Sequence, residues 1–507
     1  MTLRLLERTL PPIAFATAIL ATGSPAAASP VLDTAGSTGG NAGMQGVVSG
    51  PGAASTYFNP ALLTESEEGF LFAYGFLSEQ LGVTLDGRRG GDVPLVVGER
   101  DVVDGTGAPL PNDRVPTVWL EKGCRGGTEP GDCPAPGFAA RPRQARGSSG
   151  KTRSYLTLGL VKHIVKDRAS LGFYAMLPVS SFVTAQSFYA DEREALFSNS
   201  LHSELYGDRL TALSFAAGGA FKILPELSFG LGVTLALANT ATAATYVRDA
   251  SSYDQLLLNT ATSTQVDLSP IVGVRWAPSS SLRFGGSLRA PQGFELDTTI
   301  SATLPSGTES GTTRRDVYHW MPWMVGFGGE ADVIRRGVYT MSVTASLKYA
   351  FWSAYEDRHG QRPSVYGADL GWSDTMSVTG GFRHVWGRAR GFVDLGYAPS
   401  PVPQQIGRSS YVDNDRVGLA LGADLKVPVG RSFVRPGVQV LAHRLVRRHH
   451  TKDPSRVVDE LPDDARFDST RDPIPGAEGL QTNAPGFPGF GSQGWIWGGV
   501  FTLEVPL

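Results

Sequence analysis

The sequence has little cysteine and little charge. One charge-free run, residues 227–247, is long enough to compete as a membrane helix, but its strict alternation, two glycines and four threonines argue against that. Two cysteines among 507 residues exclude a disulfide-rich scaffold. Charged residues make up 18% and the net charge is -3, so no global basic field exists and no nucleic-acid partner is expected. The mean hydropathy of -0.09 excludes a helical membrane protein. Glycine is abundant instead, with 62 residues, and strands accommodate it better than solvated helices do.

The N-terminus has the pattern of a secretory signal. Arg4 and Arg8 form a positive region, residues 10–21 are mostly apolar, and the small residues at 25–28 suit a signal peptidase. We therefore expect residues 1–28 to be a signal peptide that is cleaved after Ala28. A retained anchor helix is the alternative, but the apolar run is short for one.

Aromatic residues recur at every second position directly after an Asn-Pro turn. Phe70, Phe72, Tyr74 and Phe76 alternate with small and mixed residues. Alternate side chains of a strand point to opposite faces, so one face of this segment is aromatic. The same period-two alternation recurs in LSFGLGVTLAL, RVGLALGADLKV and WIWGGVFTLEV. Strands, rather than helices, are therefore predicted along the chain.

The alternation predicts about fourteen strands. Their centres lie near residues 73, 159, 174, 216, 232, 269, 287, 326, 345, 380, 394, 421, 438 and 499. The links from even to odd strands are short, as in KDRA and GRAR, whereas the links from odd to even strands are long and polar. An up-and-down sheet with tight turns at one rim and long loops at the other has this pattern.

The parity of the loops favours an all-β transmembrane antiparallel β-barrel over a soluble propeller or sandwich. In a bilayer the sheet must close, with apolar residues facing lipid and glycine, serine and charged residues facing the lumen. This predicts the cell outer membrane of a two-membrane bacterium as the location, with the longest loops, about 86–152 and 447–493, outside the cell. Five tryptophans are candidates for the interfacial girdles: Trp320, Trp323, Trp352, Trp495 and Trp497.

Residues 69–507 would form the barrel, and residues 29–68 precede its first strand. A barrel of about fourteen strands is too wide for its wall side chains to fill, so it needs a channel or a plug. Asn59 can cap a helical turn that has Pro60 at its first position, followed by Ala61. We expect residues 29–68 to be an N-terminal hatch or plug in the lumen. A capped turn with no role in transport is the alternative.

The two cysteines, Cys124 and Cys133, lie in the Gly/Pro-rich stretch EKGCRGGTEPGDC. An exported chain meets an oxidising compartment, so a loop disulfide is predicted on the extracellular side. A zinc site would need distant histidines, because two thiols cannot form a tetrahedral site alone. No metal is expected.

At three places the sequence resembles the outer-membrane long-chain fatty acid transport proteins (FadL-type), which include aromatic-hydrocarbon importers. ASTYFNPALL is similar to the hatch motif of that family, before its first strand. GYAPSPVPQQIGRSSYVDNDRVGLALGADL resembles its Ser-Pro-Val-Pro loop, followed by an acidic turn and a strand. The third place is a scattered series that includes SLKYAFWSAY. The matching residues of the loop motif are Ser400, Pro401, Val402, Pro403, Asp413, Asn414, Asp415 and Arg416.

The resemblance implies a fourteen-stranded barrel with a hatch that includes Asn59, Pro60 and Ala61. It implies passive inward passage of a hydrophobic small-molecule ligand, such as a long-chain fatty acid or a hydrocarbon, and no cofactor. Gly172 falls where the kinked strand of the family lies and is a candidate for a wall opening; an ordinary lumen-facing glycine is the alternative. The expected partners are outer-membrane lipid, lipopolysaccharide and the barrel assembly machinery, and a monomer is expected.

Two other functions stay open. One is a structural or secretion-associated outer-membrane barrel without transport activity. The other is an outer-membrane hydrolase, for which HRLVRRHH, residues 443–450, together with Asp463 and Asp464 would supply candidate groups. Those groups lie at a strand end and in a polar loop, whereas catalysis needs rigidly held side chains. A basic rim that meets anionic headgroups is the simpler interpretation, so no enzymatic activity is expected.

Overall fold

A computed structural model describes most of the chain. The described residues are 30–39, 41–86, 145–179, 214–247, 256–303, 309–356, 371–406, 411–452 and 489–507. Within these ranges no helix combines the length and the apolar character needed to cross a bilayer. The predicted signal peptide and the predicted Cys124–Cys133 disulfide lie outside the described residues.

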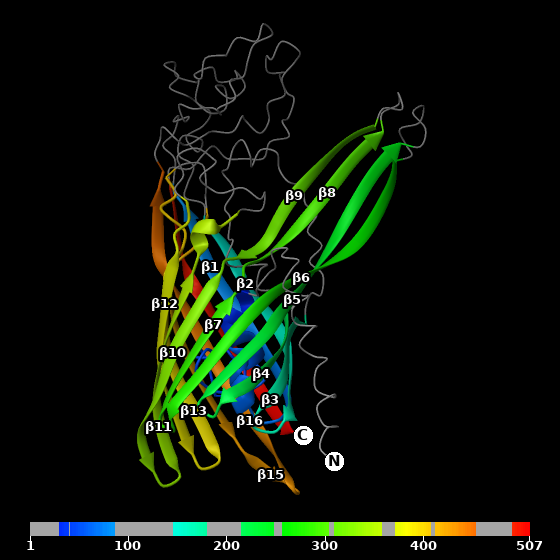
Figure 1. Ribbon diagram of the computed structural model, residues 1–507. Coiled ribbons are helices and arrows are strands. Elements are labelled where there is room, and N and C mark those ends of the chain that lie inside the picture. Colours follow the sequence, from blue (N-terminus) through cyan, green and yellow to red (C-terminus); the bar gives the residue numbers. More distant parts are fainter. Residues whose placement is uncertain are drawn as a thin grey trace, which may run out of the picture.

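Fourteen antiparallel strands form one closed barrel, as the alternation predicted (Figure 1). The ring closes because β1 pairs with both β2 and β17, and β16 joins β17 to β14. The strands of the ring are β1 (Gly69–Leu85), β2 (Ala145–Val165), β3 (Ala169–Pro178), β4 (Ser214–Leu224), β5 (Leu227–Val247), β6 (Leu256–Ser279), β7 (Leu282–Arg289), β10 (Met324–Arg336), β11 (Tyr339–Ala350), β12 (Thr375–Trp386), β13 (Ala389–Ala398), β14 (Arg416–Leu425), β16 (Ser432–Thr451) and β17 (Gly489–Pro506).

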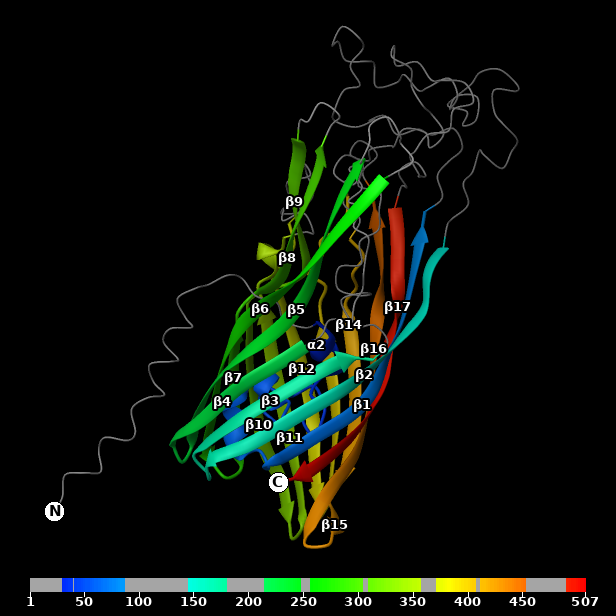
Figure 2. The ribbon, with the colours of Figure 1, turned by 90° about the vertical axis from the view of Figure 1, so that its right-hand side faces the viewer.

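The tight turns gather at one rim of the barrel, where the C-terminus also lies (Figure 2). They follow the even strands β2, β4 and β6 and then β10, β12 and β14, as the sequence predicted. Several contain a residue with positive φ: Asp167, Gly337, Gly387 and Gly430. Glycine adopts this conformation without steric cost, which lets two strands reverse direction over few residues. The β14–β16 turn also includes the short strand β15 (Val427–Val429).

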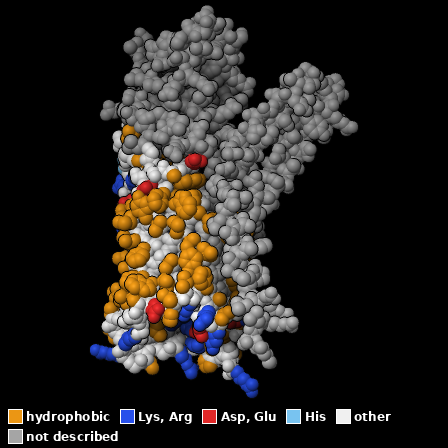
Figure 3. Space-filling model, in the orientation of Figure 1, with side chains coloured by type: hydrophobic (Ala, Val, Ile, Leu, Met, Phe, Trp, Pro, Cys, Tyr) orange, Lys and Arg blue, Asp and Glu red, His pale blue; other side chains and the backbone are white. Residues whose placement is uncertain are grey.

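The aromatic face of β1 points outward. Tyr74 is 53% exposed, whereas its neighbour Ala73 is 4% exposed, and the same alternation holds along the other strands. The outward side chains form an apolar belt on the face seen in Figure 3, and exposed apolar residues occur on every strand of the ring. Trp323, Trp495 and Trp497 belong to this outer surface. Trp352, predicted to lie in a girdle, is instead buried, and Trp320 packs with it in an interior cluster.

One hairpin was not predicted from the sequence. Residues 302–318 were expected to be a loop, but β8 (Gln292–Thr303) pairs with β9 (Glu309–Met321) outside the barrel sheet. In Figure 1 this hairpin projects from the rim opposite the tight turns. Its first strand keeps an apolar alternation at Phe294, Leu296, Ile300 and Ala302, but residues 309–316 of the second strand are polar or glycine and gave no strand pattern. A short 3-10 helix, η4 (Trp352–Ala354), follows β11 at the same rim.

The N-terminal segment, residues 30–39 and 41–68, lies inside the barrel. It contains α2 (Pro30–Ala35), α3 (Ser55–Phe58) and the 3-10 helix η2 (Pro60–Glu65). Its side chains and backbone bond to strands around the ring: Tyr174 of β3, Val274 of β6, Asp394 of β13 and Gln439 of β16. Contacts on all sides of the ring place the segment in the lumen (Figure 2).

Candidate functional site

A row of small wall positions makes room for the N-terminal segment on one side of the lumen. A Cβ added at any of these glycines would come within 4 Å of the segment: Gly159, Gly172, Gly218, Gly230, Gly273, Gly285, Gly326 and Gly328. They belong to the neighbouring strands β2 to β7 and β10. We call this set the glycine seat. Along β2 to β6 the segment packs closely against the wall, and no described residue of these strands lines the cavity described below.

Asn59, Pro60 and Ala61 lie at the centre of the glycine seat. Asn59 is fully buried; its Nδ2 donates to the carbonyl oxygens of Val47 at 2.7 Å and of Val274 at 3.1 Å. Its Oδ1 accepts from the Ala61 amide at 3.2 Å, so it caps η2, with Pro60 at the first position. The predicted cap is therefore present. In addition, the same side chain fastens the segment to β6.

Gly172 faces the lumen, where a Cβ would meet Thr56 and Leu63 of the N-terminal segment. Its pairing is continuous on both sides, with Val161 of β2 and with Gly218 of β4. The register shift between β2 and β3 lies at the turn end instead, between His163 and Val165. In the described wall, Gly172 is thus a close-packed lumen position, and a wall opening there stays a prediction.

A cavity of about 160 Å³ lies on the other side of the lumen. It separates the N-terminal segment from β7, β10 to β14 and β16. Its apolar lining comes from Met44 and Phe58 of the segment and from Met321, Met324 and Trp352 of the wall. Methionine and aromatic side chains adapt to irregular apolar ligands. This interior cavity is the candidate functional site.

The polar lining of the interior cavity is centred on Asp33 of α2. Its carboxylate accepts from Arg289 Nη1 at 3.0 Å, from Lys348 Nζ at 3.2 Å and from the Tyr57 hydroxyl at 3.1 Å. Burial alone would raise the pKa of Asp33, but Lys348 and Arg289 outweigh burial and lower the pKa to about 2. The Arg289 guanidinium also lies over the Tyr57 ring, 3.8 Å from its centroid. The carboxylate therefore stays ionised and binds α2 to the wall.

The charges that line the interior cavity are three positive and two negative, counting histidine as neutral. The positive groups are Arg289, Lys348 and Arg416, and the negative groups are Asp33 and Asp413. Arg416 has no ion pair or hydrogen bond through its guanidinium to any of the described residues. One cation of the cavity lining is thus available to a ligand.

An aromatic cluster covers the cavity on the side of the long loops. It shares Met321, Met324 and Trp352 with the cavity lining. Its rings are Trp320, Trp352, Tyr355, Trp372 and Tyr411. The Tyr355 and Trp372 rings are stacked, with their centroids 3.6 Å apart. We call this set the aromatic roof. It was missed from the sequence because its members come from four separate loops and strand ends.

The structure brings the two halves of the predicted loop motif together. Asp415 accepts from the Ser400 amide at 2.8 Å and from the Tyr397 hydroxyl at 2.7 Å. Asn414 Nδ2 donates to the carbonyl oxygens of Val446 at 2.9 Å and of Ser492 at 3.0 Å. The motif therefore fastens the loop after β13 to β14, β16 and β17.

Four other residues of the loop motif lie against the site. Pro401, Asp413 and Arg416 line the interior cavity, and Val402 belongs to the aromatic roof. Pro403 lies at the edge of this group and accepts from Gln405 Nε2 at 3.0 Å. The motif thus positions one wall of the cavity.

The three histidines of HRLVRRHH lie in different environments. His443 faces the lumen and its Nε2 is 3.0 Å from the Thr34 carbonyl oxygen. His449 pairs with Asp86 at 2.9 Å, and His450 Nδ1 accepts from the Gln405 amide at 3.0 Å. They do not converge on one point. Among the described residues no group of three or more His, Cys, Asp or Glu could hold a metal ion; Asp463 and Asp464 lie outside the described residues.

The closed antiparallel ring and its apolar outer belt define the class of the molecule. Every backbone group of a segment that crosses a bilayer must be paired, and a closed barrel satisfies this condition. An apolar belt with tight turns at one rim and long loops at the other is the architecture of outer-membrane proteins. The chain is a transmembrane β-barrel of the outer membrane.

No protein-family model and no curated protein matches the sequence. Among solved structures, the chain aligns with a FadL homologue from Pseudomonas aeruginosa at 12% identity, over 89% of this chain and 93% of that one, with a TM-score of 0.47. It aligns with the toluene transporter TodX of P. putida at 11% identity, over 92% and 98%, with a TM-score of 0.43. For the toluene transporter TbuX of Ralstonia pickettii the identity is 11%, the coverage 95% and 99%, and the TM-score 0.40.

These three proteins belong to the group that the sequence motifs resemble. The strand pairing described above, rather than these alignments, defines the architecture of the chain.

Proposed function

We propose that the protein is a passive outer-membrane channel for hydrophobic small molecules such as long-chain fatty acids or hydrocarbons. The observation that carries this proposal is the interior cavity between the N-terminal segment and the wall, which combines an apolar lining of methionine and aromatic side chains with polar and charged groups. The toluene transporters support the proposal in one respect, because they are proteins of the same broad architecture.

The size of the interior cavity suits one ring or part of a chain. A cavity of roughly 150 Å³ lined by aliphatic and aromatic side chains is enough to bind benzene, and this one measures about 160 Å³. Burial of each methylene contributes about 0.8 kcal/mol, so apolar ligands are selected over water. Arg416, at the edge, can pair with a carboxylate without giving up an existing partner.

The N-terminal segment acts in this proposal as the plug of the barrel. The N-terminal segment fills the lumen along β2 to β6, so a ligand passes on the side of β7 and β10 to β14, beneath the aromatic roof. Movement down a concentration gradient then requires local shifts of the roof and of residues 44–58, rather than removal of the whole segment.

Native mass spectrometry with extraction of bound small molecules tests the proposal on protein purified from its own membrane. We expect a copurifying fatty acid or hydrocarbon, and uptake of labelled oleate or toluene into liposomes. Ser377→Trp fills the interior cavity and should abolish both. Met376→Trp is the matched control, because Met376 precedes Ser377 on β12 but is 55% exposed on the outer face. Equal activity of the two variants would contradict the proposal. The same spectra report whether the barrel is a monomer.

A structural or secretion-associated barrel is the second candidate function. The ion pairs that fix the end of the N-terminal segment favour it: Glu65 with Arg275 at 3.0 Å, and Glu67 with Arg435 at 3.1 Å. A segment held this firmly can serve as a permanent filling. Protein that carries no ligand and takes up neither oleate nor toluene would support this second function over transport.

A further inference from the structure

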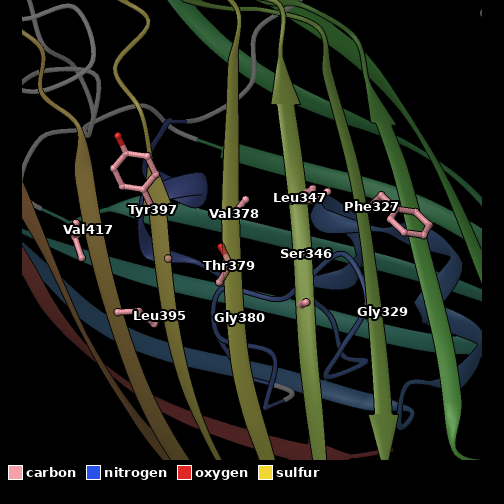
Figure 4. A pocket seen from close by; sticks show the side chains of 12 residues that line it. Phe327, Gly329, Ser346, Leu347, Val378, Thr379, Gly380, Leu395, Tyr397 and Val417 are labelled. Carbon is pink, nitrogen blue, oxygen red and sulfur yellow. The ribbon is translucent and has the colours of Figure 1, made fainter.

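The outer face of the wall carries a groove of about 510 Å³ across β10 to β14 (Figure 4). Its floor is a row of small residues at matching register: Gly329 of β10 pairs with Ala345 of β11, which pairs with Gly380 of β12. The row ends at Leu395 of β13, which pairs with Gly380. Because these three neighbouring strands carry only glycine or alanine at this level, the outer surface of the wall is concave here.

Larger side chains form the ridge beside this floor. Phe327, Leu347 and Val378 occupy the next outward row, and the row continues to Tyr397 and Val417. All five are exposed on the outer surface. The groove is therefore lined by apolar groups and opens to lipid hydrocarbon, not to the lumen.

A cation stands at the end of the ridge. Val417 pairs with Arg444 of β16, so Arg444 lies one strand further along the same row, about 4.8 Å away between backbones. Arg444 is exposed, and its guanidinium lies 5.7 Å from the centroid of the Trp495 ring. It pairs with no carboxylate among the described residues. An outward arginine beside a tryptophan is typical of the interface, where the charge reaches the headgroups.

We propose that the groove binds an acyl chain of a phosphorylated membrane lipid whose phosphate contacts Arg444. The medium next to the belt is lipid, so the natural occupant of an apolar groove there is an acyl chain. The guanidinium at the end of the ridge favours an anion, and arginine binds phosphate oxygens with two parallel hydrogen bonds. A site of this kind holds one lipid in a fixed place on the wall that encloses the interior cavity.

The test uses the full-length protein in nanodiscs that contain phosphatidylglycerol and a neutral galactolipid with the same acyl chains. Native mass spectrometry then measures the lipids that stay bound after mild stripping. The wild type should retain phosphatidylglycerol preferentially. Arg444→Gln should lower that preference roughly tenfold, the size of one lost charge-assisted hydrogen bond. Gly380→Leu fills the floor and should lower retention of both lipids.

Two controls share the chemistry of these variants but lie elsewhere. Arg388→Gln removes an exposed arginine from a tight turn at the opposite rim. Gly82→Leu adds a side chain to an outward glycine of β1, where a Cβ meets only the Gln493 carbonyl oxygen at 3.6 Å. Heat-modifiable migration on gels shows that each variant is folded. The proposal fails if either control matches its partner variant, if the neutral lipid is retained equally well, or if inorganic phosphate displaces the bound lipid.

Discussion

Asn59 and Val274 lie 215 positions apart, yet the Asn59 amide donates to the Val274 carbonyl oxygen at 3.1 Å inside the barrel. The same amide group donates to Val47, and its oxygen caps η2. One buried side chain therefore holds the fold of the N-terminal segment and fastens it to β6. A buried amide with several partners contributes more than a surface hydrogen bond, because its loss leaves carbonyl groups unpaired.

Asn59→Ala should loosen the N-terminal segment without unfolding the barrel. Loss of the cap and of two buried hydrogen bonds should cost about 2 kcal/mol in the docking of the segment. Hydrogen exchange should rise at residues 45–65 and stay unchanged in β10 to β14. Thr84→Ala, on the exposed face of β1, is the control. Unchanged exchange in Asn59→Ala would show that the cap is dispensable.

Gly273→Ala should displace the N-terminal segment by steric conflict. A Cβ at this position collides with Asn59 Oδ1 and lies 2.9 Å from Pro60 Cδ. We expect greater permeability to hydrophilic solutes in liposome-swelling assays, similar to deletion of residues 29–68. Gly286→Ala is the matched control on β7, where the nearest atom is the Gly326 carbonyl oxygen at 3.8 Å. If the deletion leaves permeability unchanged, the segment is not a plug.

Asp394→Ala should destabilise the protein strongly. Asp394 pairs with Arg383 Nη1 at 2.6 Å and accepts from the Met44 amide at 2.8 Å, and both side chains are buried. Removal of one partner of a buried pair leaves an uncompensated charge and costs roughly 3–5 kcal/mol. Denaturant unfolding in detergent measures this loss.

Lys162→Ala is the comparison for that variant, because it breaks a pair with Glu68 that is open to solvent. Exposed pairs contribute little, so the midpoint of unfolding should hardly change. A similar midpoint for Asp394→Ala would contradict the assignment of the Arg383–Asp394 pair as a buried anchor.

Acid should release α2 from the wall. The pKa of Asp33 is about 2 when the segment is docked, below its ordinary value of 3.8. A lowered pKa means that the carboxylate stabilises docking above about pH 4, and that this stabilisation is lost as the pH falls toward 2. Hydrogen exchange at residues 31–36 should be constant from pH 5 to pH 8, after correction for intrinsic rates, and rise below pH 4.

Asp33→Asn removes the titrating group and should abolish that rise, with weaker docking at every pH. A rise that persists in Asp33→Asn would assign the acid sensitivity to another carboxylate, such as Glu67. Burial raises the pKa of Glu67, but Arg435 and Lys426 outweigh the effect of burial, so this pKa is also lowered.

Much of the barrel could be predicted from the sequence because lipid and lumen impose opposite demands on alternate residues. Phe70, Phe72 and Tyr74 face lipid and Leu71 faces the lumen, so the period of two is visible in the residues themselves. The β8–β9 hairpin could not be predicted in this way. Outside the bilayer neither face of a strand needs to be apolar, and in β9 residues 309–316 are polar or glycine, so the pattern that marks a strand is absent there.

The candidate site could be predicted from the sequence only in part. The capped turn at Asn59 and the loop motif at Ser400 and Asp415 were recognised as local patterns. Their contacts with distant strands could not be predicted. Trp352 was predicted to lie at the membrane interface, but it is buried inside the barrel. A tryptophan near a strand end has the same local sequence in both locations.

The sequence by itself determined the strands, their two faces and the parity of the loops, because each depends on neighbouring residues and on the medium they meet. Only the tertiary structure decided that Asp33 meets Arg289 and Lys348, and that the wall glycines form a seat for the N-terminal segment. Those contacts depend on the register of fourteen strands and on closure of the ring, which bring together residues that are hundreds of positions apart.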